Sequence, residues 1–210
     1  MHLLRKRELD LATDYAVLEQ EIADYQGKFL EVYGNFNLSS IIPVVKVLHQ
    51  TMMSEDKTVF VCGNGGSASL SQHFSIDLGL GTKRFLGTKG CRVIDLTSNA
   101  AIVTATANDV GYEYVFSDQV NLLANGNDLL VTISSSGNSR NILNALEKAK
   151  ELGVSTIGLT GFDGGKVRSL VDYSIHVDTN PGDYGMVEDV HSFILHCLTH
   201  LVRFVERRAQ

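Results

Sequence analysis

A glycine-rich loop after a short apolar run is the first stretch whose residues could do chemistry. The run 58–62 is rich in β-branched and aromatic residues, which favour a strand, and Gly63-Asn64-Gly65-Gly66-Ser67 follows it. The next residues have helical spacing. Glycines let a backbone approach an anion closely, and free N–H groups at a helix N-terminus hold negative charge. The loop therefore predicts a phosphate cradle, with an ordinary turn as the alternative. It matches neither the P-loop pattern nor the dinucleotide fingerprint.

A second loop of the same kind is rich in serine. Ser134-Ser135-Ser136-Gly137-Asn138-Ser139 follows the apolar run 128–133 and precedes a predicted helix at 140–152. Capping a helix takes one serine, whereas this loop offers four hydroxyls beside the N–H groups of a helix N-terminus. We therefore expect it to bind an anion or sugar hydroxyls, with plain capping as the alternative.

Four side chains on two predicted helices are of types that bind metal ions. His73 and Asp77 lie four residues apart on the helix after the first loop, so they project from one face. Glu188 and His196 lie eight residues apart on the last predicted helix, about 80° apart around its axis. Two imidazoles and two carboxylates suit Zn²⁺. The alternative is that these four side chains are ordinary surface or core residues, and their spacing alone favours this alternative.

The elements that must position these groups alternate along the chain. Apolar runs predict five strands, at 58–62, 92–96, 128–133, 154–159 and 171–177. Segments with helical periodicity separate most of them, and a glycine-punctuated loop is predicted at 79–90. This alternation predicts an α/β fold with a doubly wound, flavodoxin-like, five-stranded parallel sheet. In such sheets ligands bind beyond the carboxyl ends of the strands, where both polar loops lie.

Two further helices, at 8–33 and 39–52, are predicted before the first strand. We expect residues 1–56 to form an N-terminal helical extension and residues 57–210 to form the α/β domain, together one structural unit. At 210 residues and 44% hydrophobic, the chain can bury one good core. The two helices either wrap their own domain or form an oligomer interface with another copy.

The composition argues against several classes of protein. A net charge of −6 is unlike the basic stripe of a nucleic-acid binder, and no stretch approaches the roughly 18 apolar residues of a membrane span. The charges at the N-terminus precede no apolar signal segment. Three widely spaced cysteines in apolar runs, Cys62, Cys91 and Cys197, predict reduced core thiols. We therefore expect a cytoplasmic protein that binds neither nucleic acid nor membrane.

Five segments together resemble the SIS (sugar isomerase) domain family, and within it the phosphoheptose isomerase branch. They are 62–67, Asn108-Asp109 with Gly111, 133–139, 159–166, and 188–191 with His196. The resemblance spans most of residues 20–205. It implies a homotetramer with active sites between subunits. The reaction it implies turns D-sedoheptulose 7-phosphate into D-glycero-D-manno-heptose 7-phosphate through an enediol, for the heptose of lipopolysaccharide or capsule.

The resemblance also implies roles for individual residues. The phosphate would be held by the hydroxyls of Ser134, Ser135, Ser136 and Ser139. The other substrate-binding positions are Asn64, Gly65, Gly66, Ser67, Asn108, Asp109 and Glu188. The zinc ligands of the family, which are His, Glu, Gln and His, fall on His73, Asp77, Glu188 and His196. The catalytic base and its acid partner would be Asp77 and His196.

Two of the four implied zinc ligands differ from the family pattern. Asp77 replaces Glu, which withdraws a base by more than the ~1 Å that can cost about a hundredfold in rate. Glu188 replaces Gln and adds a negative charge, which would tighten metal binding and weaken Lewis acidity. We therefore hypothesise that Asp77 is a ligand and that Glu188 is the catalytic base.

Two functions of different classes remain open at this point. One is an isomerase that acts on sedoheptulose 7-phosphate or a related sugar phosphate. The other is a non-catalytic SIS-domain protein that binds a sugar phosphate or a protein partner such as a replication initiator. His196 favours the enzyme, because the non-catalytic branch lacks this histidine. Unpaired buried carboxylates in a pure binder would also cost several kcal/mol.

Overall fold

The computed structural model describes residues 11–87 and 91–209, and it divides the chain into two compact units, residues 1–35 and 36–210. The first unit contains helix α1 (Leu11–Asn35), where Phe29 and Tyr33 stack with ring centroids 6.2 Å apart, one turn apart on the helix. The second unit contains the sheet together with helix α2 (Ile41–Met52). The units therefore separate after residue 35, which differs from the boundary expected at residue 56.

The second unit is built on a parallel sheet, which has five strands over the described residues. These are β1 (Thr58–Gly63), β2 (Arg92–Asp95), β3 (Leu129–Ser134), β4 (Ser155–Thr160) and β5 (Tyr173–His176). Their spatial order is β2-β1-β3-β4-β5. Both β1 and β3 are buried along their whole length, as their continuous apolar runs predict for strands covered on two faces. This is the flavodoxin-like order, and it confirms the predicted doubly wound sheet.

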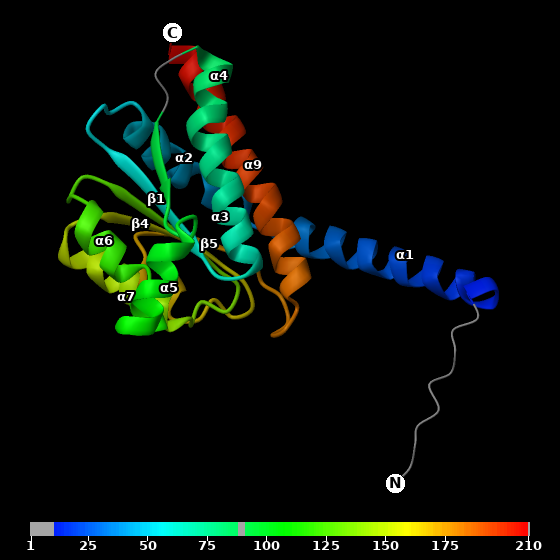
Figure 1. The fold of residues 1–210 in the computed structure, drawn as a ribbon. Helices are drawn as coiled ribbons and strands as arrows, with labels where there is room; N and C mark the ends of the chain where they lie inside the picture. The colour runs from blue at the N-terminus through cyan, green and yellow to red at the C-terminus, as the bar shows by residue number, and fades with distance from the viewer. Residues whose placement is uncertain (1–10, 88–90, 210) are drawn as a thin grey trace. The chain divides into compact units, whose positions relative to one another are not determined.

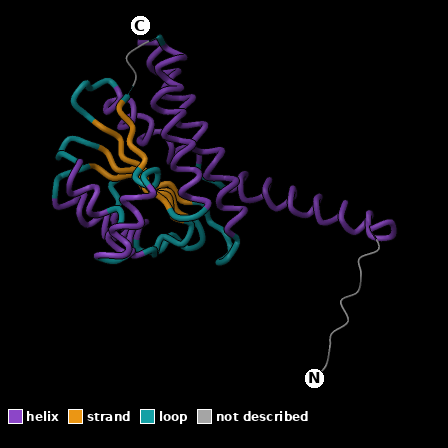
Figure 2. Tube along the Cα trace, in the orientation of Figure 1, coloured by secondary structure: helices purple, strands orange, loops and turns teal. Residues whose placement is uncertain are grey.

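Helices cover both faces of this sheet (Figure 1; Figure 2). On one face, α9 (Tyr184–Ala209) packs against α2 and α3 (Gly66–Ile76). On the other face lie α5 (Ala100–Asp109), α6 (Ser117–Leu123) and α7 (Arg140–Glu151), with α8 (Val167–Leu170) beside α7. Short helical turns are η1 (Leu38–Ser40) and η3 (Tyr112–Tyr114). The side chains of Phe60, Leu130 and Ile142 form the centre of the core between β1, β3 and α7.

Two elements differ from the prediction. Where the sequence predicts a loop at 79–90, α3 continues through the π-helical turn η2 (Asp77–Gly81) into α4 (Thr82–Leu86), and residues 88–90 lie outside the described part of the chain. The glycines serve close packing, because a Cβ at Gly79 would lie 3.3 Å from the Val93 side chain. Strand β2, expected at 92–96, ends at Asp95 and is half-exposed, because its described pairing is to β1 on one side.

The cysteines are free thiols in the structure, as the sequence predicts. Cys62 is fully buried, whereas Cys91 and Cys197 are partly buried. Burial raises the pKa of the Cys91 thiol to about 12, so this group stays protonated and unreactive at neutral pH.

The conformation of the serine-rich loop depends on Gly137. Its φ is +60°, and a Cβ at this position would overlap the carbonyl oxygen of Gly164. We expect Gly137→Ala to lower the free energy of unfolding by roughly 2 kcal/mol or more, since left-handed backbone alone costs about 1–2 kcal/mol. Gly87→Ala is the matched control, because Gly87 has left-handed backbone with a φ of +69° and open space around it. Urea denaturation measures both variants, and equal losses would contradict the overlap.

Candidate active site

The two polar loops meet at the switch point of the sheet, where β1 and β3 lie side by side. Gly63 pairs with Ile133, so the loops leave the sheet at almost the same level. The Asn64 side chain donates to Asn141 Oδ1 at 3.0 Å, and Asn141 Nδ2 donates back to Asn64 Oδ1 at 2.8 Å. The structure therefore joins the glycine-rich loop to the first turn of α7, directly behind the serine-rich loop.

The glycine-rich loop presents the N-terminus of α3. Gly65 precedes the helix with a φ of +55°, and Gly66 is its first residue. A Cβ at Gly63 would lie 2.6 Å from the carbonyl oxygen of Ser67, so the turn closes tightly on itself. The backbone N–H groups at this end, with the helix dipole, favour a negatively charged group.

The serine-rich loop has hydroxyls that the fold itself does not use. Ser135 Oγ is buried and has no hydrogen-bond partner within the described chain. Ser139 is the N-cap residue of α7, yet its side chain makes no capping hydrogen bond there. A buried hydroxyl without a partner costs about 1–3 kcal/mol. These two serines therefore fit a ligand better than the capping alternative.

Tyr112 and Asn141 are candidate site residues that the sequence analysis did not identify. The Tyr112 hydroxyl donates to Asn64 Oδ1 at 2.9 Å, so Asn64 accepts from two side chains at once. In the sequence, Asn141 could have been recognised as an additional polar side chain in the first turn of a helix that already has a serine at its N-cap position. Asn108 and Asp109 lie exposed at the end of α5 and bond to each other at 2.7 Å. They lie on the same connection as Tyr112, and the described hydrogen bonds do not join them to either loop.

A second group of side chains forms where α3 meets α9. The Nε2 atoms of His73 and His196 lie 3.1 Å apart, and Asp77 Oδ2 lies 3.3 Å from the first and 3.7 Å from the second. Donor atoms around a tetrahedral ion with bonds of 2.0–2.2 Å are about 3.4 Å apart. The three atoms therefore lie close to three corners of a tetrahedron. This group, called the His73–Asp77–His196 group below, can hold a metal ion.

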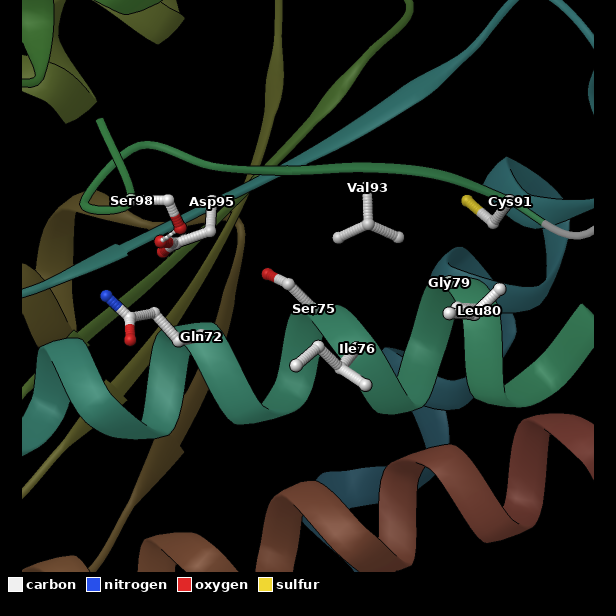
Figure 3. A pocket seen from close by; sticks show the side chains of 9 residues that line it. All are labelled: Gln72, Ser75, Ile76, Gly79, Leu80, Cys91, Val93, Asp95 and Ser98. Atoms are coloured by element: carbon white, nitrogen blue, oxygen red, sulfur yellow. Dashed lines mark hydrogen bonds between the residues drawn. The ribbon is translucent and has the colours of Figure 1, made fainter.

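Contacts on the opposite face of α3 explain why the side chains of residues 73 and 77 point toward α9. Gln72 and Ser75 point toward β2, and together with Ile76 they border a cavity of ≈ 520 Å³ (Figure 3). Asp95 accepts hydrogen bonds there from the hydroxyls of Ser71 and Ser98. Because one face of α3 is occupied by β2, residues 73 and 77 are turned toward α9.

Glu188 does not belong to the His73–Asp77–His196 group, as far as the described residues go. Its carboxylate occupies the space that a Cβ at Gly66 would fill, so it lies directly against the N-terminal end of α3. Burial, and secondly the charge of Asp189, raises the pKa of the Glu188 carboxyl above its ordinary value. The structure therefore places this carboxylate at the glycine-rich loop.

His191 has a structural role, although it lies between these residues on α9. It is fully buried, and its Nε2 lies 3.2 Å from the carbonyl oxygen of Thr160. Burial lowers the pKa of His191 to about 4, so the ring stays neutral. It joins α9 to the end of β4.

Comparison with known proteins places this arrangement in a family. The SIS domain family matches residues 29–161. A phosphoheptose isomerase of Helicobacter pylori (strain P12) is 44% identical over 155 residues, which cover 73% of this chain and 78% of that protein. A phosphoheptose isomerase of Campylobacter concisus (strain 13826) is 35% identical over 187 residues, which cover 89% and 95%.

A solved structure agrees with the sequence comparison. Phosphoheptose isomerase GmhA from Neisseria gonorrhoeae matches with a TM-score of 0.78 at 28% identity, over 88% of this chain and 98% of that one. The predicted resemblance is confirmed. The chain belongs to the SIS domain family, in the group of the phosphoheptose isomerases.

Proposed function

We propose that this chain is an isomerase that converts D-sedoheptulose 7-phosphate into D-glycero-D-manno-heptose 7-phosphate. The relatives with this activity in their names match most of the chain. The observation that carries the proposal is the convergence of two anion-binding loops at the sheet edge, with the Glu188 carboxylate against Gly66. A positioned carboxylate beside a phosphate site can serve as the general base for proton transfer on a sugar phosphate.

The serine-rich loop is proposed to hold the phosphate. The hydroxyls of Ser134, Ser135, Ser136 and Ser139 would donate to its oxygens, together with the first N–H groups of α7. The unused hydroxyls of Ser135 and Ser139 support this role. On the glycine-rich loop, the hydrogen bonds from Tyr112 and Asn141 fix the amide of Asn64 for contact with the sugar.

Glu188 is proposed as the base that takes the proton from C1 of the ketose. The C2 oxygen gains a proton as the enediol forms, Glu188 then returns its proton to C2, and the C1 hydroxyl gives up its own. The net transfer of that second proton from O1 to O2 would pass through solvent water. A pKa raised by burial suits this shuttle, because it brings the carboxyl closer to neutral pH. Asp77 is proposed as a metal ligand, because its Oδ2 lies between the two imidazoles.

Zn²⁺ is the proposed ion for the His73–Asp77–His196 group, because two imidazoles and a carboxylate with an open fourth position suit it. When bound, it would supply Lewis acidity toward the sugar oxygens. His196 Nε2 cannot hold an ion and donate a proton at the same time. The geometry therefore supports the ligand role of His196 over the acid role that the resemblance implies.

The homotetramer with sites between subunits is also part of the proposal. Glu188 and His196 lie eight residues apart on α9, which is about 12 Å of helix rise. Within one chain this separation is larger than the distance between neighbouring carbon atoms of a sugar, so Glu188 and the His73–Asp77–His196 group could not act on the same carbons. A site in which the loops and Glu188 of one copy face the group of another copy would bring all of them to the same carbons.

A conversion assay tests the function. The zinc-loaded protein should convert sedoheptulose 7-phosphate into the aldose, with much slower conversion of unphosphorylated sedoheptulose and of fructose 6-phosphate. Turnover of fructose 6-phosphate alone would contradict the seven-carbon substrate.

A cytoplasmic location remains a prediction, and within the described part of the chain we find no helix with the length and apolar character of a membrane span.

Removing the Ser135 hydroxyl tests the phosphate site. We expect Ser135→Ala to raise KM for the sugar phosphate about tenfold or more, since a hydrogen bond to a charged group is worth about 1.5–3 kcal/mol. The melting temperature should not fall, because the described fold makes no hydrogen bond with this hydroxyl. Steady-state kinetics and thermal unfolding measure the two effects. An unchanged KM would exclude Ser135 from the phosphate site.

A further inference from the structure

A π-helical turn lies directly beside the His73–Asp77–His196 group. Asp77 is the first residue of η2, and its carbonyl accepts from the N–H of Thr82, five residues later, instead of four. Single π-helical turns are rare and widen the helix by one residue, and they occur often at functional sites. The direction of the Asp77 side chain therefore depends on a turn that the helix alone does not favour.

Arg203 on α9 connects the two ends of this turn. Its Nη2 donates to the carbonyl oxygen of Asp77 at 2.6 Å, and its Nε donates to Thr82 Oγ1 at 3.1 Å. The Thr82 hydroxyl is buried and donates to the same Asp77 carbonyl at 3.1 Å. The carbonyl thus accepts from a backbone amide, a hydroxyl and a guanidinium.

The surroundings leave a defined place for the Arg203 guanidinium. A Cβ at Gly81 would lie 2.7 Å from Nη2, so a glycine at this position makes room for the side chain. The guanidinium carbon also lies 5.3 Å from the centroid of the Phe85 ring, within the range of a cation–π contact. The turn, the glycine and the ring together hold the planar donor group in one orientation.

Arg203 and His196 act from the same face of α9. They lie seven residues apart, close to two full turns, so their side chains project in nearly the same direction. His196 Nε2 lies 3.7 Å from the Asp77 carboxylate, while Arg203 binds the Asp77 main chain. Helix α9 therefore contacts Asp77 at both its side chain and its backbone.

We propose that Arg203 is a positioning residue for the metal centre, which fixes the π-helical turn so that the Asp77 carboxylate faces His73 and His196. The inference rests on the proposed function, because it requires Asp77 to be a metal ligand. Groups that orient metal ligands from behind typically contribute 10–100-fold to metal affinity. Arg203 is in that position relative to Asp77.

The test compares metal binding by Arg203→Met, Arg203→Lys and Arg207→Met. We expect Arg203→Met to raise the dissociation constant for Zn²⁺ about 10–100-fold, measured by competition with a chelating indicator. The absorption spectrum of the Co²⁺-loaded variant should also change, because the ligand geometry around the ion changes. Arg203→Lys should recover part of the affinity, since one donor can still reach the Asp77 carbonyl.

Arg207 provides the matched control. It lies one turn further along α9 and stacks on the same Phe85 ring, 4.0 Å from its centroid. Arg207→Met should therefore bind Zn²⁺ like the wild type and show the same Co²⁺ spectrum. Any general effect of losing a cation from the ring would appear in both Met variants.

Three outcomes would overturn the inference. The first is wild-type affinity and an unchanged Co²⁺ spectrum in Arg203→Met, even if its melting temperature falls, because that would show a purely structural role. The second applies if Arg203→Met does not fold. Wild-type Zn²⁺ affinity and an unchanged Co²⁺ spectrum in Arg203→Lys would then overturn the inference, because only part of the affinity is expected in that variant. The third is a His73→Ala variant that binds Zn²⁺ as tightly as the wild type, which would refute the proposed metal centre itself.

Discussion

Glu188→Gln is expected to lower kcat by about 10²–10⁴-fold and to leave KM near its wild-type value. Proton transfer by a positioned base contributes this much to a rate, and Gln has the same shape but cannot take the proton. The carboxylate lies against Gly66 at the glycine-rich loop, where it would contact the reacting end of the sugar. Steady-state kinetics with sedoheptulose 7-phosphate measures the loss. An unchanged kcat would exclude Glu188 as the base.

The pH dependence gives the same residue a second signature. Burial raises the pKa of Glu188, so kcat/KM should fall as the pH drops through a value above the ordinary ~4.3 of Glu, and this limb should vanish in the Gln variant. The folded chain holds this proton more tightly than the unfolded chain. Ionised Glu188 therefore destabilises the fold as the pH rises through the interval between the two pKa values. The Gln variant should not melt earlier than the wild type at neutral pH.

Two further variants separate the base from its surroundings. Asp189→Asn removes a charge that raises the pKa of Glu188, so the acid limb should move to lower pH while kcat is kept.

Adding Asp77→Glu to Glu188→Gln restores the pattern of the family at both positions. This double variant should regain part of the lost turnover. No recovery would mean that Glu at position 77 cannot replace the base in this chain.

His196→Gln is expected to weaken Zn²⁺ binding by at least a hundredfold and to lower turnover with it. The imidazole supplies one of three donor atoms that lie 3.1, 3.3 and 3.7 Å apart, and the two remaining donors cannot enclose an ion. Groups that only orient a ligand already contribute 10–100-fold. Metal analysis after dialysis against a weak chelator, followed by the activity assay, measures both effects.

His200 is the control for this variant. It is exposed and lies one turn further along α9, and it is not part of the His73–Asp77–His196 group. His200→Gln should therefore keep both the metal and the activity. A His196→Gln protein that retains a full equivalent of Zn²⁺ would refute the proposed ligand set.

The sheet could be predicted from the sequence because its central strands are continuous apolar runs. Residues 58–62 and 128–133 are buried on both faces, and a strand in that environment is a nearly continuous apolar run, which can be recognised in the sequence. The helical turns at 77–86 could not be predicted in the same way. Gly79 and Gly81 indicate a loop locally, yet they are required for the approach of Val93 and Arg203, which come from distant parts of the chain.

The candidate site shows the same limit. The pairing of His73 with Asp77 follows from helical spacing, whereas the contact with His196 spans 123 positions and needs the packing of α9 on α3. Within the described chain Glu188 lies apart from this group, because eight residues of α9 are about 12 Å of helix rise, and its role as a metal ligand stays a prediction. Asn141 and Tyr112 were missed because their contacts to Asn64 cross 77 and 48 positions.

The most direct test of the isomerase is proton exchange during turnover in D₂O. The zinc-loaded protein is incubated with sedoheptulose 7-phosphate, and the sugar is followed by NMR, with Glu188→Gln in parallel. New aldose signals with deuterium at C2 are expected in the wild type, and both should be lost in the variant. A wild-type protein that leaves the sugar unchanged, without deuterium at any carbon, would refute the proposed isomerase.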